Sequence, residues 1–284
     1  MTFSRLAIIG PGLLGGSIAL AVREKMPGVH VSIWARRQEA VDEVINRKIA
    51  DFASTDLLAA TANAGLVVIC VPVDTMASLA EKIAGHIPPS ALVTDVGSVK
   101  APVVESLQRI FAGRARFVGS HPMAGSELAG IEAARAGLFE GATCIVTPGA
   151  ETDGNDVEAI RQFWAMLGGL PMLLSPGEHD EVIALVSHLP HLIAATLVNL
   201  VCAQNPNSLN CTGSGFRDTT RVASGSPEMW TGIFGCNREQ LKKSVHAMIE
   251  KLQEVAVFIE DDGKMRQFLA DAKTRRDSLK KGNK

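Results

Sequence analysis

The sequence predicts an α/β fold in which a nucleotide-binding domain, built around a parallel sheet, is followed by an all-helical domain. Apolar runs of the kind that form buried parallel strands alternate with helical segments up to about residue 176. A glycine-rich turn directly follows the first of these runs. Beyond residue 176 the pattern is helical almost throughout. We therefore expect two domains, which cover residues 1–176 and residues 177–284.

The first strand, turn and helix carry the pattern of a dinucleotide site. Residues 6–10 form an apolar run, residues 17–25 have helical character, and the sequence GxGxxG lies between them. Such a turn lets the backbone approach a pyrophosphate, whose charge the positive end of the following helix attracts. A second apolar run, at residues 30–35, follows at the spacing of a Rossmann-type dinucleotide-binding domain. The residues expected against the cofactor are Gly10, Gly12, Leu13, Leu14 and Gly15.

The end of the second apolar run bears on the choice between NAD and NADP. NAD enzymes usually place an acidic residue there to bind the ribose 2′-hydroxyl, whereas a 2′-phosphate calls for arginine. This sequence has Ala35, Arg36 and Arg37 at that point. We therefore expect both arginines to contact the cofactor and NADP to be favoured over NAD. The alternative is that both arginines are solvated at the start of the helix expected at residues 38–48.

Later apolar runs end at Pro, Gly or Ser, and these ends predict the reactive part of the site. Three of the runs cover residues 64–72, 90–98 and 116–125. In a doubly wound sheet, ligands bind beyond the carboxyl ends of the strands. The residues expected to converge there on the nicotinamide are Val71, Pro72, Ser98 and His121. Two further runs, residues 143–148 and 171–175, are expected to complete the same sheet.

The expected helical domain contains polar residues that a purely structural bundle does not need. His188 and His191 lie three positions apart in an apolar helix, although either one could be an ordinary core histidine. Arg221 follows a glycine-rich segment, and its planar guanidinium group suits a carboxylate. Trp230 could cover an apolar ring, although a core position is equally compatible with the sequence.

Composition favours a small-molecule partner. The chain has 28 basic and 30 acidic residues and a net charge of −2, so it lacks the broad basic surface that holds nucleic acid or an anionic membrane. Its five cysteines are widely spaced without a CxxC pair, which argues against a disulfide framework and a zinc site. The histidines also lack a familiar metal-ligand spacing. We expect a cytoplasmic protein without a bound metal.

Five motifs, taken in order, resemble those of the prephenate and arogenate (cyclohexadienyl) dehydrogenases of tyrosine biosynthesis. They read GPGLLGGS, DVGSVK, GSHPMAGSE, SHLPH and GFRDTTR with a later MW, and the resemblance spans about residues 5–260. It implies oxidative decarboxylation of prephenate to 4-hydroxyphenylpyruvate, or of arogenate to tyrosine, with hydride transfer to NAD or NADP. It also implies a Rossmann-type domain with an all-helical C-terminal dimerisation domain, and therefore a homodimer formed through the helical domain.

The same resemblance assigns roles to individual residues. His121 looks like the catalytic base, Ser98 like the hydroxyl beside it at the reacting carbinol, and Arg221 like the arginine that binds a substrate carboxylate. Other residues that the resemblance places in or near the substrate pocket are His191, Ser126, Glu127 and Trp230. A neutral histidine suits the removal of the hydroxyl proton while a hydride leaves the same carbon.

Two questions stay open at the level of the sequence. Another NAD(P)-dependent dehydrogenase, acting on a β-hydroxy acid or an imino acid, shares the same α/β and helical layout. Prephenate and arogenate differ only in a keto or an amino group on the side chain. Glu127 could favour the amine and His191 the keto acid, and we expect prephenate to be preferred with dual use.

Overall fold

The computed structural model describes residues 3–125, 130–204 and 206–279. The chain forms two compact units, one comprising residues 1–237 and the other residues 238–284. The first unit holds the sheets together with a group of helices, and the second unit is a pair of helices.

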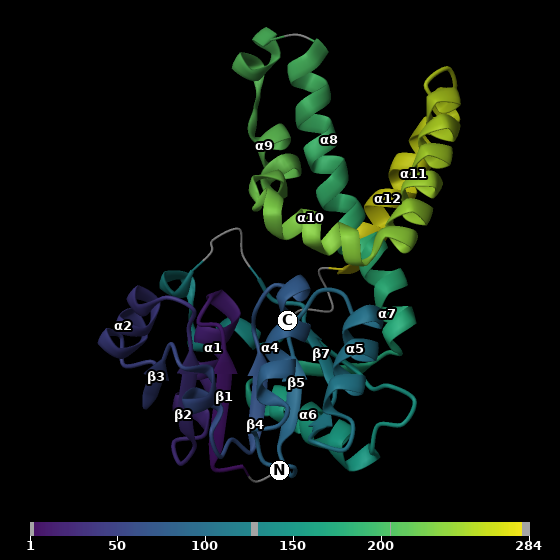
Figure 1. Ribbon diagram of the computed structural model, residues 1–284. Coiled ribbons are helices and arrows are strands. Elements are labelled where there is room, and N and C mark those ends of the chain that lie inside the picture. The colour runs from purple at the N-terminus through teal and green to yellow at the C-terminus, as the bar shows by residue number, and fades with distance from the viewer. Residues whose placement is uncertain (1–2, 126–129, 205, 280–284) are drawn as a thin grey trace. The chain divides into compact units, whose positions relative to one another are not determined.

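A six-stranded parallel sheet forms the centre of the first unit, with the strand order β3-β2-β1-β4-β5-β6 (Figure 1). The order reverses between β1 and β4, and in such sheets ligands bind at the carboxyl ends of the strands beside this reversal. The strands are β1 (Arg5–Ile9), β2 (His30–Trp34), β3 (Phe52–Ser54), β4 (Leu66–Ile69), β5 (Leu92–Asp95) and β6 (Arg116–Phe117).

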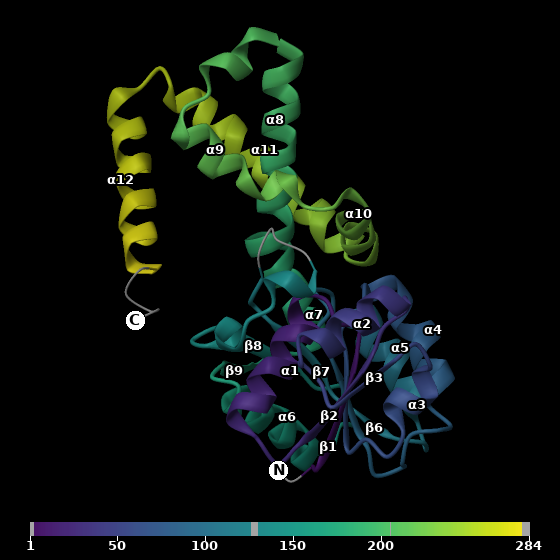
Figure 2. The ribbon, with the colours of Figure 1, turned by 90° about the vertical axis from the view of Figure 1, so that its left-hand side faces the viewer.

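Helices cover both faces of this sheet and bury a separate apolar cluster on each face (Figure 2). On one face, Ile18 and Val22 of α1 (Leu13–Lys25) share a cluster with Phe163 and Trp164 of α6 (Gly154–Met166). The helices whose buried residues belong to the other cluster are α3 (Leu57–Thr61), α4 (Val73–Ile83) and α5 (Ala101–Phe111). The remaining helix of this layer, α2 (Gln38–Asn46), connects β2 to β3.

The later strands do not extend the parallel sheet, so the expectation of one continuous sheet is wrong. Strand β7 (Gly119–Pro122) is antiparallel to β8 (Thr143–Thr147), which is parallel to β9 (Leu170–Leu173), and the three form a second sheet. The apolar run at residues 116–125 therefore divides between two sheets. After β6 pairs with β5, the backbone N–H of Ser120 donates to the side chain of Asp95, at the end of β5, at 3.2 Å. Two short 3₁₀ helices, η1 (Ile131–Ala133) and η2 (Ala136–Phe139), lie between β7 and β8.

A long apolar helical run follows the second sheet. Ser175 caps its first segment, α7 (Pro176–Ile183), through a capping box with Glu178. A π-helical turn, η3 (Ala184–His188), links α7 to α8 (Leu189–Gln204). Pro190 has no N–H to donate back into the preceding turn, which accounts for an irregular turn at this point. By length and hydropathy alone residues 176–204 could cross a membrane, and one third of their most apolar stretch is buried inside the protein.

Short helices complete the first unit and a helical hairpin forms the second. After α8 come η4 (Pro206–Cys211), α9 (Ser214–Thr220), η5 (Arg221–Ser224) and α10 (Pro227–Cys236). The second unit consists of α11 (Arg238–Phe258) and α12 (Asp262–Leu279), which pack together with the rings of Phe258 and Phe268 6.1 Å apart.

A buried ion pair connects the two sheets. The side chains of Lys100 and Asp95 are both fully buried and form a salt bridge at the carboxyl end of β5. The Lys100 ammonium group also donates to the backbone carbonyl of Ser120 in β7 at 2.9 Å. In addition, the Ser120 hydroxyl donates to the backbone carbonyl of Asp95 at 2.6 Å. These bonds hold β7 against the loop that follows β5.

We expect the replacement Lys100→Met to lower the free energy of unfolding by about 3–5 kcal/mol, because it leaves the Asp95 carboxylate buried without its cation. Urea denaturation of purified protein measures the change. The control is Lys242→Met, since Lys242 pairs with Glu239 on the surface. It should change the free energy of unfolding by no more than about 0.5 kcal/mol. An unchanged urea midpoint for Lys100→Met would show that the ion pair does not hold the fold together.

Candidate active site

The glycine turn after β1 has the geometry that a dinucleotide needs. Gly10 has φ +105°, and a Cβ atom there would lie 2.6 Å from the carbonyl oxygen of Cys70. A Cβ atom on Gly15 would lie 2.0 Å from the carbonyl oxygen of Gly10, so α1 packs closely against the turn. Around Gly12, at the start of α1, a Cβ atom would meet no atom within 4 Å. The open backbone at the helix N-terminus therefore fits a pyrophosphate.

Neighbouring residues from the sequence prediction lie around this turn. Leu13 and Leu14 are half-buried and pack against the core beneath α1. Val71, after β4, is half-buried, and its Cγ1 would be 3.0 Å from a Cβ atom on Gly10. Pro72 is exposed at the start of α4. The structure thus brings the ends of β1 and β4 together.

Arg36 and Arg37 are exposed between β2 and α2. Ala35 beside them is buried, and its backbone N–H donates to the carbonyl of Ser54 at 3.1 Å. The indole of Trp34 donates to the carbonyl of Thr55 at 2.9 Å. Both arginines therefore project from the end of a strand that is fixed to β3, with no acidic residue between Trp34 and Gln38.

Ser98 and His121 lie on segments that the buried ion pair joins. Ser98 is half-buried in the loop after β5, next to Gly97, whose N–H donates to the Asp95 carboxylate at 2.8 Å. His121 lies in β7 opposite Ile145 of β8 and is 8% exposed. The predicted base therefore lies on a short strand.

His121 begins a chain of hydrogen bonds that leads into α7. Its Nδ1 lies 2.9 Å from Nε2 of His179, and Nδ1 of His179 lies 2.8 Å from a carboxylate oxygen of Asp180. The Asp180 carboxylate also accepts the backbone N–H groups of Lys100 and Ala101, at 2.7 and 2.8 Å. Asp180 thus binds the start of α5 as well as the histidine.

Burial lowers the pKa of His121 well below its ordinary value. Positive charge on His179, Lys100 or His188 acts in the same direction. Burial also lowers the pKa of His179, and the Asp180 carboxylate opposes that effect. Burial lowers the pKa of His188 to about 4. These three histidines are therefore neutral at neutral pH, which is the form of His121 that can accept a proton.

A second group of rings surrounds the two histidines of the SHLPH motif. The ring of His191 stacks on Trp230 with centroids 3.6 Å apart and an interplanar angle of 17°. His188 packs edge-on against Trp230 and Phe234. Gly225 leaves room for this stack, since a Cβ atom there would lie 2.5 Å from the indole nitrogen.

The two histidines differ in their polar contacts. Nδ1 of His188 lies 3.2 Å from the side-chain nitrogen of Asn237, which also donates to the backbone carbonyl of Asp180 at 2.9 Å. Within the part of the chain that the structure describes, His191 Nδ1 is buried without a hydrogen-bond partner, whereas His188 also faces the backbone of Ser98. Unpartnered buried nitrogen atoms are unusual and point to a site for a polar ligand.

Three predicted residues remain: Arg221, Ser126 and Glu127. Arg221 begins η5, which packs against α8, and its side chain is exposed. Ser126 and Glu127 lie outside the described residues. In the described ranges 3–125, 130–204 and 206–279, no three His, Cys, Asp or Glu side chains are grouped so that they could hold a metal ion.

Sequence reasoning missed His179 and Asp180. Both side chains are almost completely buried in the first two turns of α7, at 0% and 3% exposure. The sequence did contain a signal for them, because they directly follow a capping box and precede an apolar helix. Polar residues that face a core at such a position rarely lack a partner, so the pair could have been predicted to form a buried polar contact. It also missed Lys100, since nothing in the local sequence marks a lysine as buried.

Comparisons with known proteins agree over most of the chain. Residues 18–172 match the family model for the nucleotide-binding domain of prephenate dehydrogenase, and residues 175–273 match the model for its dimerization domain. A prephenate dehydrogenase of Bacillus subtilis is 34% identical over 96% of this chain and 76% of its own length. A cyclohexadienyl dehydrogenase of Zymomonas mobilis is 34% identical over 90% of this chain and 89% of its own length.

Solved structures give the same result. A prephenate dehydrogenase from A. aeolicus, in complex with hydroxyphenyl propionate and NAD⁺, has a TM-score of 0.92 and 31% identity, and covers 98% of this chain and 99% of its own. An arogenate dehydrogenase from Synechocystis has a TM-score of 0.82 and 30% identity, and covers 97% of this chain and 99% of its own.

Proposed function

The chain belongs to the prephenate dehydrogenase family, and we propose that it converts prephenate to 4-hydroxyphenylpyruvate by oxidative decarboxylation, with NADP preferred over NAD. Arogenate is the second substrate, which would yield tyrosine. The observation that carries the proposal is a buried, neutral histidine, His121, held next to the loop after β5 at the carboxyl end of the sheet.

The proposed reaction removes a hydride and a proton from the carbinol of a cyclohexadienol ring. A nicotinamide cofactor held at the glycine turn after β1 would supply the hydride acceptor for the carbinol carbon. His121 accepts the hydroxyl proton, and the Ser98 hydroxyl orients the same oxygen. Carbon dioxide then leaves from the opposite ring carbon, and the electron pair of the broken bond completes the aromatic ring. The proton on His121 returns to the resulting phenolate oxygen, so the base is regenerated.

The other residues bind and enclose the substrate. Arg221 pairs with a substrate carboxylate, for which its planar guanidinium group is suited. His191 and Trp230 form an aromatic wall beside the ring, and the unpartnered Nδ1 of His191 can bond a polar group of the substrate. Ser126 and Glu127 complete the pocket in the proposal, although they lie outside the described residues. Aromatisation supplies the driving force, so holding the substrate and excluding water are the main tasks of the protein.

The proposed cofactor contacts follow the geometry of the glycine turn. The backbone of Gly10 and Gly12 at the start of α1 would hold the pyrophosphate, and Gly15 lets α1 pack closely against the turn. Leu13, Leu14, Val71 and Pro72 are the residues proposed to contact the cofactor on either side of the glycine turn. Arg36 and Arg37 bind the 2′-phosphate of NADP, a role supported by their exposed position at the end of β2.

We also propose that two chains form a homodimer through a helical domain of residues 177–284. The dimerization-domain match at residues 175–273 supports this assembly and the boundary near residue 176. Large apolar side chains exposed on α7 to α8 and on the hairpin are available for such an interface: Val182, Leu185, Val186, Leu200, Leu252, Val257, Ile259 and Leu269. The proposed location is the cytoplasm, which suits five free cysteines.

Substrate and cofactor are tested by measuring cofactor reduction with prephenate and arogenate, each with NADP⁺ and NAD⁺. We expect kcat/KM to be highest with prephenate and NADP⁺, because a bound 2′-phosphate gains charge-assisted hydrogen bonds from the arginines. The double variant Ala35→Asp, Arg36→Gln should favour NAD⁺. A tenfold preference of the unaltered protein for NAD⁺ would contradict the NADP assignment.

The base is tested by His121→Asn. We expect kcat to fall by about 10² to 10⁴ with a much smaller change in KM, because asparagine cannot accept the proton. In the unaltered protein, activity should be constant near neutral pH and be lost as pH falls through the pKa of His121. Burial has lowered that pKa, so the loss should occur below the ordinary range of histidine.

The control for His121→Asn is His86→Asn, because His86 is exposed between α4 and β5, outside the proposed site. It should leave kcat and the pH profile unchanged. If the acid loss of activity persists in His121→Asn, the base is a different group.

Arg221→Gln tests the carboxylate contact. We expect KM for prephenate to rise by about 30-fold, equivalent to about 2 kcal/mol, with little change in KM for the cofactor. The matched control is Arg217→Gln in α9, an exposed arginine that donates to the carbonyl of Thr212. Equal effects of the two replacements on KM for prephenate would assign Arg221 a structural role.

A further inference from the structure

Asp180, His179 and His121 form an unbroken hydrogen-bonded chain of buried side chains. The exposed fractions of the three residues are 3%, 0% and 8%. Only His121 has a role in the proposed reaction. The direction of each hydrogen bond in the chain can be deduced from the groups at its Asp180 end.

The first link fixes the proton on His179. Oδ1 of Asp180 accepts the N–H of Lys100 and Oδ2 accepts the N–H of Ala101, at 2.7 and 2.8 Å. Two backbone N–H donors, one on each oxygen, favour the ionised form of a carboxyl group, and that form can only accept hydrogen bonds. Nδ1 of His179, 2.8 Å from Oδ1, must therefore carry the proton and donate it to Asp180.

The second link fixes the proton on His121. A neutral imidazole carries one N–H, so with Nδ1 protonated the Nε2 atom of His179 is an acceptor. Burial lowers the pKa of His179, which keeps the ring neutral. Nε2 of His179 lies 2.9 Å from Nδ1 of His121. His121 Nδ1 must be the donor, and the lone pair of neutral His121 is therefore on Nε2.

We propose that Asp180 and His179 are positioning residues that hold His121 in its Nδ1–H tautomer, so that Nε2 is the atom that accepts a proton. In the opposite tautomer Nε2 already carries a hydrogen and cannot act as a base. The assignment of Nε2 as the catalytic atom rests on the proposed function, whereas the tautomer itself does not.

Titratable groups on α7, at the start of α5, in the π-helical turn and at the end of β5 surround the chain. His121 faces His179 from α7, Lys100 from the start of α5 and His188 from the π-helical turn, and positive charge on any of them opposes its protonation. His179 additionally faces the carboxylates of Asp180 and Asp95, which favour positive charge. When His121 accepts a proton at Nε2, its Nδ1–H···His179–Asp180 bonds become charge-assisted and stronger. No proton has to move along the chain for this effect.

The tautomer can be measured without substrate. Long-range ¹H–¹⁵N NMR spectra of protein labelled with ¹⁵N-histidine distinguish a protonated from an unprotonated ring nitrogen, and the signals of His121 are those lost in His121→Asn. We expect Nδ1 of His121 to be protonated and Nε2 to be unprotonated near neutral pH. A His121 protonated at Nε2 would overturn the proposal.

Replacements of His179 and Asp180 test whether these residues set the tautomer of His121. His179→Leu removes the acceptor, so His121 should shift to the Nε2–H form and kcat with prephenate should fall about 10²-fold or more, with KM changed less than about threefold. His179→Gln offers a carbonyl acceptor and should recover part of kcat and of the original tautomer. Asp180→Asn should shift the tautomer as well. It also weakens the contact with α5, so the His179 variants decide the matter if Asp180→Asn does not fold.

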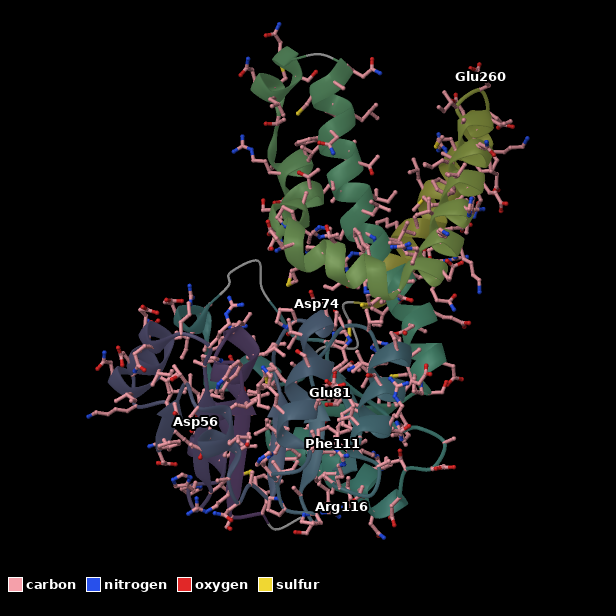
Figure 3. All side chains as sticks on the ribbon, in the orientation of Figure 1. Asp56, Asp74, Glu81, Phe111, Arg116 and Glu260 are labelled. Carbon is pink, nitrogen blue, oxygen red and sulfur yellow. The ribbon has the colours of Figure 1, made fainter. Side chains whose placement is uncertain are left out.

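Matched controls use residues remote from the chain. Asp156→Asn alters a buried carboxylate that is bonded to Arg116. Figure 3 shows Arg116 at the opposite end of the strands from Asp74, which lies at the start of α4 near the carboxyl end of the sheet. His86→Leu alters an exposed histidine. Both should leave the His121 tautomer unchanged. An unchanged tautomer in His179→Leu would overturn the proposal, whereas an Nδ1–H tautomer in a protein that does not oxidise prephenate or arogenate would overturn only the proposed function.

Discussion

The rest of the site depends on the ion pair and hydrogen bonds that the buried Lys100 makes. It pairs with Asp95 at the end of β5 and donates to the carbonyl of Ser120 in β7, so it joins the parallel sheet to the second sheet. The backbone N–H of the same residue donates to Asp180. Side chain and backbone of one residue therefore fix the strand that carries His121 and the helix that carries its partner. Because a buried ion pair tolerates little displacement, these three elements hold one relative arrangement.

Much of the fold was predictable because its signals are local. The glycine turn, the apolar strands and the change to helices after residue 176 each depend on neighbouring residues, and so does the position of His121 near a strand end. The second sheet was not predictable, since the division of residues 116–125 depends on a bond between Ser120 and Asp95, which are 25 positions apart in the sequence. His179 was missed for the same reason, because its partner His121 is 58 positions away.

The two histidines of the SHLPH motif illustrate how backbone irregularity separates similar residues. The sequence left both as possible core residues. The π-helical turn that ends at His188 directs that ring toward Asn237, whose side chain also donates to the Asp180 carbonyl, whereas His191 one turn later stacks flat on Trp230. His188 thus belongs to the support of α7, and His191 belongs to the aromatic wall. A regular helix would place residues three positions apart on one face and give them similar surroundings.

Helix α7 creates two properties of His121 at once. Its packing against β7 contributes to the burial that lowers the pKa of His121 and keeps the ring neutral, and His179 supplies the acceptor that selects the tautomer. Neither property suffices alone, because a neutral ring in the wrong tautomer has no lone pair at Nε2, and a charged ring has none at either nitrogen. Asp180 anchors α7 to the start of α5 through two backbone bonds, and Asn237 holds its carbonyl from the end of α10. The protonation of the proposed base is therefore a consequence of how the helices dock, which is why a single histidine motif in the sequence could indicate the position of this residue but not its tautomer.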